Sequence, residues 1–168
     1  VAGDAKLALG ALVAAVAGHK AGNDPRAALA ALKATKRARF DELARSTEAP
    51  IRPERLISAL QSVLPEDAVI VADPGTPCPY FSAHYEVRRP GRHFITNRSH
   101  GALGYSMSAS IGAQVGRPDK KVVAVMGDGS FGFTAGEMET VVRLKLPITF
   151  VVVSNAVFGW IKAGQKYG

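Results

Sequence analysis

Two short apolar runs rich in β-branched residues, at positions 122–126 and 148–153, set the strongest limit on how this chain folds. Such runs are typical of parallel strands that are covered on both faces of a sheet. Between them, Thr134 and Glu137 have the spacing of a helix start, and Pro147 lies just past the expected helix end. The stretch therefore predicts a β-α-β unit of an α/β fold with a doubly wound parallel sheet.

Asp128 and Asn155 follow the two predicted strands, each at the carboxyl end. A right-handed crossover brings both residues to the edge where open α/β sheets bind ligands. Gly127 and Gly129 allow a tight turn and a close approach of the backbone to a ligand. An Asp carboxylate, an Asn amide oxygen and the backbone carbonyl of Val157 suit octahedral Mg²⁺ and leave coordination positions for phosphate oxygens. The nearby helix start would offer N–H groups to an anion, so the stretch predicts a metal-bridged diphosphate site.

Residues 127–130 read GDGS and residues 154–159 read SNAVFG. Together they resemble the cofactor signature of thiamine-diphosphate enzymes of the acetolactate synthase and 2-oxoacid decarboxylase superfamily. In that signature GDG is followed by a pair of asparagines, and the second asparagine binds the metal. Asn155 lies 27 positions after Asp128, where the second asparagine belongs, whereas Ser154 replaces the first. The resemblance implies cofactor contacts from Gly127, Asp128, Gly129, Ser130, Asn155, Phe158 and Gly159, with Mg²⁺ held by Asp128, Asn155 and Val157.

A second stretch, at residues 97–112, contains Gly101-Ala102-Leu103-Gly104. It resembles the family's glycine-flanked apolar residue at the start of a small-residue helix. The resemblance implies that Leu103 is a wedge that folds the cofactor, and that the carbonyl of Gly101 accepts a hydrogen bond from the aminopyrimidine. His100 would lie near the thiazolium, where a histidine can shuttle protons or hold a carboxylate. A glycine-rich helix start and a surface histidine are the alternative interpretations.

Residues 68–72 are predicted as a strand that leads into Asp73-Pro74-Gly75-Thr76. By position this loop resembles the one that reaches the far side of the diphosphate, which implies contacts from Gly75 and Thr76. A routine Pro-Gly turn is the alternative. We also expect a helix at 53–64, whose apolar residues form one stripe, and a short strand at 94–96.

The first 48 residues differ in character from the rest. They predict an alanine-rich helix that ends near Ala17 and a second helix from about Asp24-Pro25 to Ala44. Residues 1–48 resemble the last strand-helix step of the family's middle domain, with the strand at residues 1–5, and its linker. Residues 49–168 resemble the pyrophosphate-binding domain, which on this resemblance is incomplete at its C-terminal end.

Composition excludes several kinds of partner. The net charge is +7, but no nucleic-acid motif accompanies the basic residues and aromatic residues make up only 7%, so we expect no nucleic-acid partner. The apolar runs are too short to span a bilayer and no basic leader is present, so we expect no membrane segment. The single cysteine, Cys78, is flanked by prolines and expected in a loop as an inert thiol. It fits a reducing compartment, which favours a cytoplasmic location.

The resemblance implies an enzyme that breaks or forms C–C bonds at a 2-oxoacid or related carbonyl substrate, as an acetolactate synthase-like lyase, decarboxylase or transferase. Its implied cofactors are thiamine diphosphate and Mg²⁺, while the binding of FAD is left open. The implied partner is a pyrimidine-binding domain or chain that supplies a glutamate to the N1′ atom across a subunit interface. The protein would thus be a homo- or hetero-oligomer, catalytic only together with that domain.

Two other classes of protein fit parts of the sequence. A non-catalytic assembly subunit would keep the fold without turnover, and Ser154 is the residue that favours it. A nicotinamide-dependent oxidoreductase would use GDGSFG, at residues 127–132, as its glycine-rich turn. Asp128 would then face a pyrophosphate without a metal, and the next strand ends in Ser-Asn rather than in an acidic residue. The thiamine-diphosphate interpretation is therefore preferred.

Overall fold

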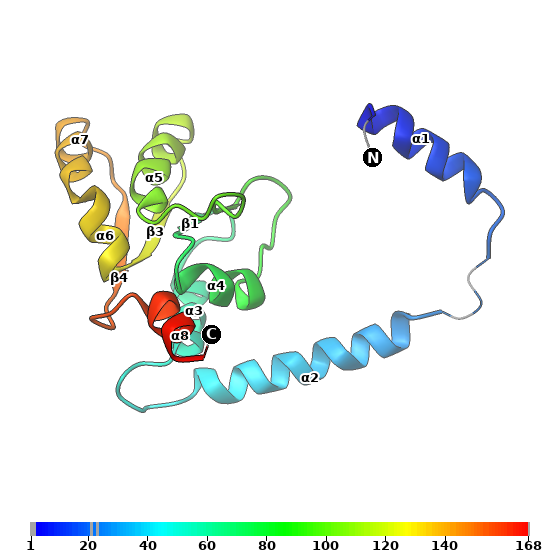
Figure 1. The fold of residues 1–168 in the computed structure, drawn as a ribbon, viewed down its shortest axis with the longest axis horizontal. Helices are drawn as coiled ribbons and strands as arrows, with labels where there is room; N and C mark the ends of the chain where they lie inside the picture. Colours follow the sequence, from blue (N-terminus) through cyan, green and yellow to red (C-terminus); the bar gives the residue numbers. More distant parts are fainter. Residues whose placement is uncertain (1–2, 21, 23, 168) are drawn as a thin grey trace. The chain divides into compact units, whose positions relative to one another are not determined.

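The computed structural model describes residues 3–20, 22 and 24–167. The chain forms two compact units, Val1–Ala38 and Arg39–Gly168, and the described strands all belong to the second (Figure 1). In chain order the second unit contains α3 (Pro53–Val63), β1 (Val69–Ala72), α4 (Pro77–His84), β2 (Phe94–Ile95), α5 (Tyr105–Gly116), β3 (Val122–Gly127), α6 (Asp128–Thr134), the 3₁₀ helix η1 (Ala135–Glu137), α7 (Met138–Arg143), β4 (Thr149–Val153) and α8 (Gly159–Tyr167).

The first unit is helical, with α1 (Ala5–Ala15) and most of α2 (Arg26–Ala44). Side chains cap both helices, because the Leu7 amide donates to Asp4 and the Arg26 amide donates to Asp24, each at 3.0 Å. The predicted start of the second helix is thus confirmed. The predicted strand at residues 1–5 is wrong at positions 3–5, since α1 begins at residue 5, and its first two residues lie outside the described part of the chain.

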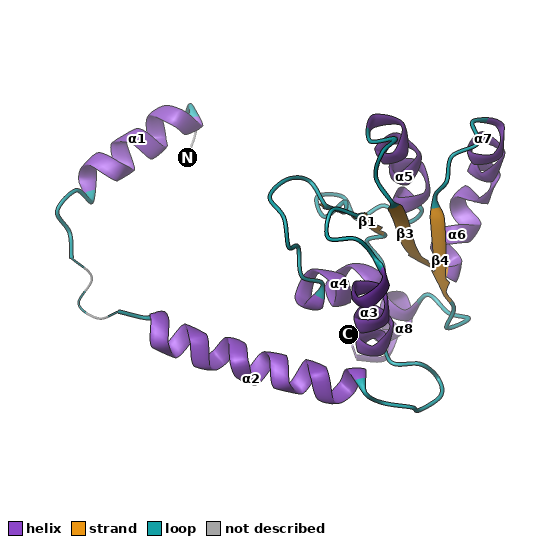
Figure 2. Ribbon diagram, turned by 180° about the vertical axis from the view of Figure 1, so that it is seen from behind, coloured by secondary structure: helices purple, strands orange, loops and turns teal. Residues whose placement is uncertain are grey.

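The sheet of the second unit has the order β2-β1-β3-β4, and every neighbouring pair is parallel. The predicted strands at 68–72, 94–96, 122–126 and 148–153 are confirmed to within one residue at each end. Helices cover both faces, with α3 and α4 on one and α5, α6 and α7 on the other (Figure 2). The α/β class with a doubly wound parallel sheet is therefore confirmed.

Strand residues alternate between the two cores, as the pleat requires. One core contains Ile70, Ala72, Val123 and Val125 with Phe40, Ile57 and Phe81. The other contains Val69, Val71, Val122, Ala124 and Met126 with Met107, Tyr105, Phe131 and Met138. The Phe40 ring, 3% exposed, also stacks on His84 with ring centroids 4.9 Å apart. The end of α2 therefore packs in the core of the second unit, which begins at Arg39. The boundary that the resemblance implies, between a middle domain at 1–48 and a pyrophosphate-binding domain at 49–168, stays a prediction.

Two local expectations are wrong. The predicted helix after Thr134 is present as η1 and α7, but Thr134, at the N-cap of η1, makes no side-chain cap, and an additional helix, α6, begins at Asp128. The reason is tertiary, because the Thr134 hydroxyl donates to the carbonyl of Gly104 at 3.2 Å. Cys78 lies buried in α4 rather than in a loop. Pro77 occupies the first turn of α4, where its missing N–H costs no hydrogen bond.

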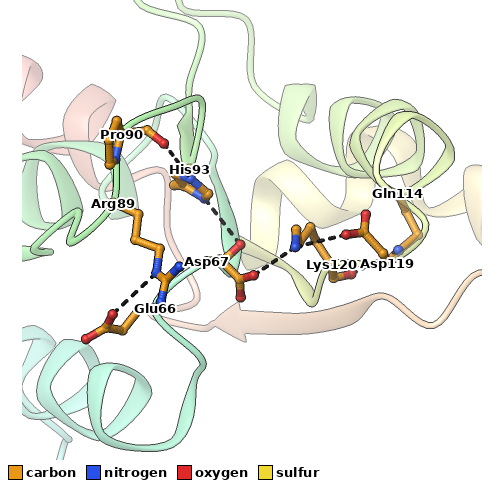
Figure 3. Close-up of polar contacts among 8 residues, drawn as sticks. All are labelled: Glu66, Asp67, Arg89, Pro90, His93, Gln114, Asp119 and Lys120. Carbon is orange, nitrogen blue, oxygen red and sulfur yellow. Dashed lines mark hydrogen bonds and ion pairs between the residues drawn. The ribbon is translucent and has the colours of Figure 1, made fainter.

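Charged residues form hydrogen bonds and ion pairs just before the strands β1 and β3 begin (Figure 3). Lys120 lies 2.8 Å from the carboxylate of Asp67 and 2.9 Å from that of Asp119. The hydrogen bond from Lys120 is the main cause that lowers the pKa of each carboxyl group. The buried His93 ring has a nitrogen 3.2 Å from the carbonyl oxygen of Asp67 and another 3.2 Å from that of Pro90. Among the described residues, every helix is too short or too polar to traverse a bilayer.

Candidate functional site

A cavity of about 130 Å³ lies where β1, β3 and β4 end, and a single water needs only about 10–15 Å³ by the same measure. Its wall includes the predicted cofactor and metal residues Gly75, Thr76, Leu103, Gly127, Asp128, Gly129, Ser130, Asn155, Val157, Phe158 and Gly159. Gly101 and His100 are exposed on the preceding loop and are not part of the wall. The structure thus brings all but two of the predicted residues together, while their roles in binding stay predictions.

Asp128 is held by residues that follow the neighbouring strand, β4. Its Oδ2 atom accepts a hydrogen bond from the Ser154 hydroxyl at 3.1 Å and one from the Ala156 amide at 2.9 Å. Both of these bonds end on the same oxygen, Oδ2. Ser154, which replaces an asparagine of the family signature, therefore still links the loop after β4 to Asp128.

The carboxylate of Asp128 is ionised more easily than an ordinary aspartate. Burial raises its pKa, but hydrogen bonds from Ser154, Gly129 and Ala156 lower it more in sum, and the net pKa lies below the ordinary value. A carboxylate that accepts several hydrogen bonds stays charged at neutral pH. Asp128 therefore offers a negative charge at the cavity wall at neutral pH.

The loop after β4 presents a second oxygen. Asn155 Oδ1 accepts a hydrogen bond from the Val157 amide at 3.1 Å, which closes an Asx turn, and Ala156 between them has a φ of 53°. A Cβ added at Gly159 would lie 3.3 Å from the Asn155 side-chain nitrogen and 3.6 Å from the Thr76 hydroxyl. The turn therefore fixes the Asn155 side chain beside the loop that follows β1.

Aromatic side chains crowd the same wall. A Cβ added at Gly129 would overlap the Phe158 ring, so only glycine permits this approach. Phe158 also lies beside Phe133, with ring centroids 6.2 Å apart. Trp160 lines the cavity as well. Phe158 and Trp160 therefore supply apolar surface to the cavity wall.

The loop before α5 supplies the opposite wall. Gly104 precedes α5 with a φ of 88°, and a Cβ added there would lie 2.9 Å from the Thr134 side chain. Leu103 points toward the loop after β1, because its Cδ2 atom would lie 3.3 Å from a Cβ added at Gly75. A side chain at position 75 would therefore displace Leu103 by a few tenths of an ångström. The predicted wedge residue thus lines the cavity against the predicted diphosphate loop.

Asp73 is a residue of the site region that the sequence interpretation missed. Its carboxylate is fully buried and accepts hydrogen bonds from Gly104, Ser106 and Ser130. The sequence analysis assigns it no role of its own within the loop Asp73-Pro74-Gly75-Thr76. A carboxylate directly after a buried strand, the same placement as Asp128 after β3, was the signal that could have identified it.

The donor set favours a hard cation. Within residues 3–20, 22 and 24–167, no three His, Cys, Asp or Glu side chains come together as a metal centre. The predicted set is instead one carboxylate, one amide oxygen and one backbone carbonyl, from Asp128, Asn155 and Val157. Mg²⁺ usually takes few protein oxygens and completes its octahedron with phosphate and water. The residues present therefore fit a Mg²⁺-bound diphosphate.

The chain matches a family model and several known proteins. The model of the family "Thiamine pyrophosphate enzyme, C-terminal TPP binding domain" matches residues 73–168. The chain is 34% identical over 128 residues to the acetolactate synthase isozyme 2 large subunit of Escherichia coli (strain K12), which covers 76% of the chain and 22% of the enzyme. It is 27% identical over 113 residues to benzoylformate decarboxylase of Pseudomonas aeruginosa, covering 67% of the chain and 21% of that enzyme.

A solved structure shares the fold. The thiamine diphosphate-dependent 4-hydroxybenzoylformate decarboxylase of Rhodococcus jostii RHA1 superposes with a TM-score of 0.65 at 23% identity. The match covers 72% of this chain and 23% of that chain. This chain spans about a fifth of the length of the relatives it matches.

Proposed function

This chain belongs to the thiamine pyrophosphate enzymes and contains their C-terminal TPP binding domain, and from that membership we propose that its cavity binds thiamine diphosphate through Mg²⁺. The observation that carries the proposal is the meeting of Asp128 and Asn155 at one cavity. The two residues are 27 positions apart in sequence and follow neighbouring parallel strands. In this proposal they hold one cation between them.

Each residue of the cavity has a distinct task. Asp128 Oδ1, Asn155 Oδ1 and the carbonyl of Val157 hold Mg²⁺, and the lowered pKa of Asp128 keeps its charge available. The loop with Gly75 and Thr76 contacts the diphosphate from the β1 side. These contacts fix the ligand at the end of the sheet, where the backbone can approach closely.

Leu103 and Phe158 shape the apolar part of the cavity. Leu103 would contact the cofactor, and the Phe158 ring would lie beside the cation site. When bound, thiamine diphosphate supplies the electron sink that stabilises a carbanion next to a carbonyl carbon. The chain's own residues bind and orient it. His100 and Gly101 stay candidates for contact with the ring end of the cofactor.

The proposed reaction is C–C bond cleavage or formation at a 2-oxoacid or related carbonyl substrate, as a lyase or a transferase. The names of the relatives support this class, since one is an acetolactate synthase subunit and another is a benzoylformate decarboxylase. We propose further that the site is completed by a pyrimidine-binding domain with a glutamate for N1′, in a cytoplasmic oligomer. Residues 1–48 are then the end of a middle domain.

The test is calorimetry on the full-length protein with thiamine diphosphate, in Mg²⁺ and in EDTA. We expect binding in Mg²⁺ that EDTA abolishes. Asp128→Asn should weaken binding by at least about 100-fold, because it removes the charge that holds the cation. Glu139→Gln is the control, since Glu139 is an exposed carboxylate on α7 that pairs with Arg143 at 3.0 Å. Equal affinity in Mg²⁺ and in EDTA would contradict the proposal.

A further inference from the structure

Asp73 is a fully buried carboxylate next to the cavity but not part of its wall. Its Oδ2 atom accepts hydrogen bonds from the amides of Gly104 and Ser106, at 3.0 and 3.1 Å, and from the Ser106 hydroxyl at 3.1 Å. Its Oδ1 atom accepts one from the Ser130 hydroxyl at 2.7 Å. Asp73 therefore connects the end of β1 to the start of α5 and to the first turn of α6.

The hydrogen-bond donors to Asp73 are all neutral groups. In the described part of the chain, its hydrogen-bond donors are two amides and two hydroxyls, with no lysine or arginine among them. A buried carboxylate is costly unless several donors reach it. Two of these donors are amides at the start of α5, where the helix dipole is positive. Because Gly104 at the N-cap has no side chain, Asp73 caps α5 from another element.

Capping alone does not account for the second oxygen. A cap of α5 requires only Oδ2, whereas Oδ1 reaches Ser130 on α6. Gly104 directly follows Leu103, and Ser130 lies two residues after Asp128. The carboxylate thus joins the segments that carry two opposite walls of the cavity. Asp73 itself also lies two residues before Gly75, which contacts the same leucine.

We propose that Asp73 is a positioning residue, which holds Leu103 and Asp128 at a fixed separation for the cofactor. This inference rests on the proposed function of the cavity. It also assigns a different role to the Ser130 side chain, which the sequence placed among the cofactor contacts. The Ser130 hydroxyl donates to Asp73, so it acts on the ligand through the geometry of α6.

The test measures thiamine diphosphate affinity at saturating Mg²⁺ in the full-length protein carrying Asp73→Asn, Ser130→Ala or both changes. Asp73→Asn keeps an oxygen for the α5 amides but presents an NH₂ group to Ser130. Ser130→Ala cuts only the link to α6. We expect each single change to weaken binding about tenfold, and the double change to weaken it no further, because residues of one network are not additive.

Ser110→Ala is the matched control. Ser110 is fully buried on α5, and its hydroxyl donates to the Met107 carbonyl at 2.7 Å, the same length as the bond between Ser130 and Asp73. The control should lower the melting temperature of the cofactor-free protein as much as Ser130→Ala does, and leave the affinity unchanged. This comparison separates positioning from stability, since a purely structural role would give both serine variants the same affinity.

Three results would overturn the inference. The Asp73 and Ser130 variants could bind as tightly as the Ser110 variant, or their effects could add. Alternatively, Ser130→Ala could weaken binding while Asp73→Asn leaves it unchanged, which would mean direct contact between Ser130 and the ligand. If Asp73→Asn does not fold, Ser106→Ala takes its place, because the Ser106 hydroxyl donates to Asp73 and Ser106 does not line the cavity. Weaker binding by this variant supports the inference, and unchanged binding overturns it. If the unmodified protein binds no thiamine diphosphate in Mg²⁺, the proposed function itself is wrong and this inference is lost with it.

Discussion

The ionised form of Asp128 is stabilised by hydrogen bonds from the loop after β4 and from its own neighbour Gly129. Burial works against ionisation, and the hydrogen bonds from Ser154, Gly129 and Ala156 reverse that effect, so the pKa falls below its ordinary value. The carboxylate is thus ionised at every pH above that lowered value. Cation binding at Asp128 should persist at neutral pH and be lost only as the pH falls through the lowered pKa.

Ser154→Ala should move this loss to higher pH. The variant lacks the hydroxyl that donates to Oδ2, so the pKa of Asp128 rises toward the ordinary value of about 3.9. The measurement is a ¹³C NMR titration of the aspartate carboxyl groups in the full-length protein. Ser108→Ala, at an exposed position on α5, is the control and should leave the titration unchanged. A wild-type Asp128 that titrates at or above the ordinary value would contradict this account.

At the scale of elements, the strands were predictable and the short helices were not. All four described strands came from apolar runs such as 122–126, because strands covered on both faces require such runs. Asp128 and Asn155 could be placed at one edge of the sheet because each follows one of these parallel strands. The sequence did not predict α6, since its glycine-rich segment is typical of a turn and is held as a helix by contacts with residues distant in sequence. The bond between Ser130 and Asp73 is one of them, and local pattern cannot reveal it.

The start of α5 depends on a glycine with a left-handed backbone. Gly104→Ala should destabilise the protein by about 1–3 kcal/mol, because φ is 88° and the new methyl group would lie 2.9 Å from Thr134. Chemical denaturation of the full-length protein measures the effect.

Gly112→Ala is the matched control for this prediction. It lies inside the same helix with open space around it, and should stabilise the protein by about 0.5–1 kcal/mol. Equal effects of the two substitutions would show that the backbone of Gly104 is not under the proposed constraint.

On the scale of the whole molecule, the resemblance to thiamine-diphosphate enzymes is confirmed by the family match over residues 73–168. The division of the chain could not be predicted from composition. The compact unit begins at Arg39, inside α2, because one aromatic side chain of that helix belongs to the core of the sheet. Helical sequence continues on both sides of that side chain, so periodicity alone gives no boundary there.

Phe40→Ala should lower the free energy of unfolding of the second unit by about 3–5 kcal/mol, since it leaves a cavity beside Ile57 and Phe81. Leu32→Ala is the control on the same helix, because Leu32 is 67% exposed and its loss should change stability by less than about 0.5 kcal/mol. Urea denaturation followed by tryptophan fluorescence measures both. A Phe40 variant as stable as the Leu32 variant would place the end of α2 outside the core.

The most direct test of the central claim is the location of the cation. Crystals of the full-length protein grown with thiamine diphosphate and Mn²⁺ in place of Mg²⁺ would reveal the metal by its anomalous scattering. We predict one peak within about 2.0–2.3 Å of oxygen atoms from Asp128, Asn155 and the Val157 carbonyl, bridged to the diphosphate. A metal peak elsewhere, or a diphosphate bound without contact to Asp128 and Asn155, would contradict the account.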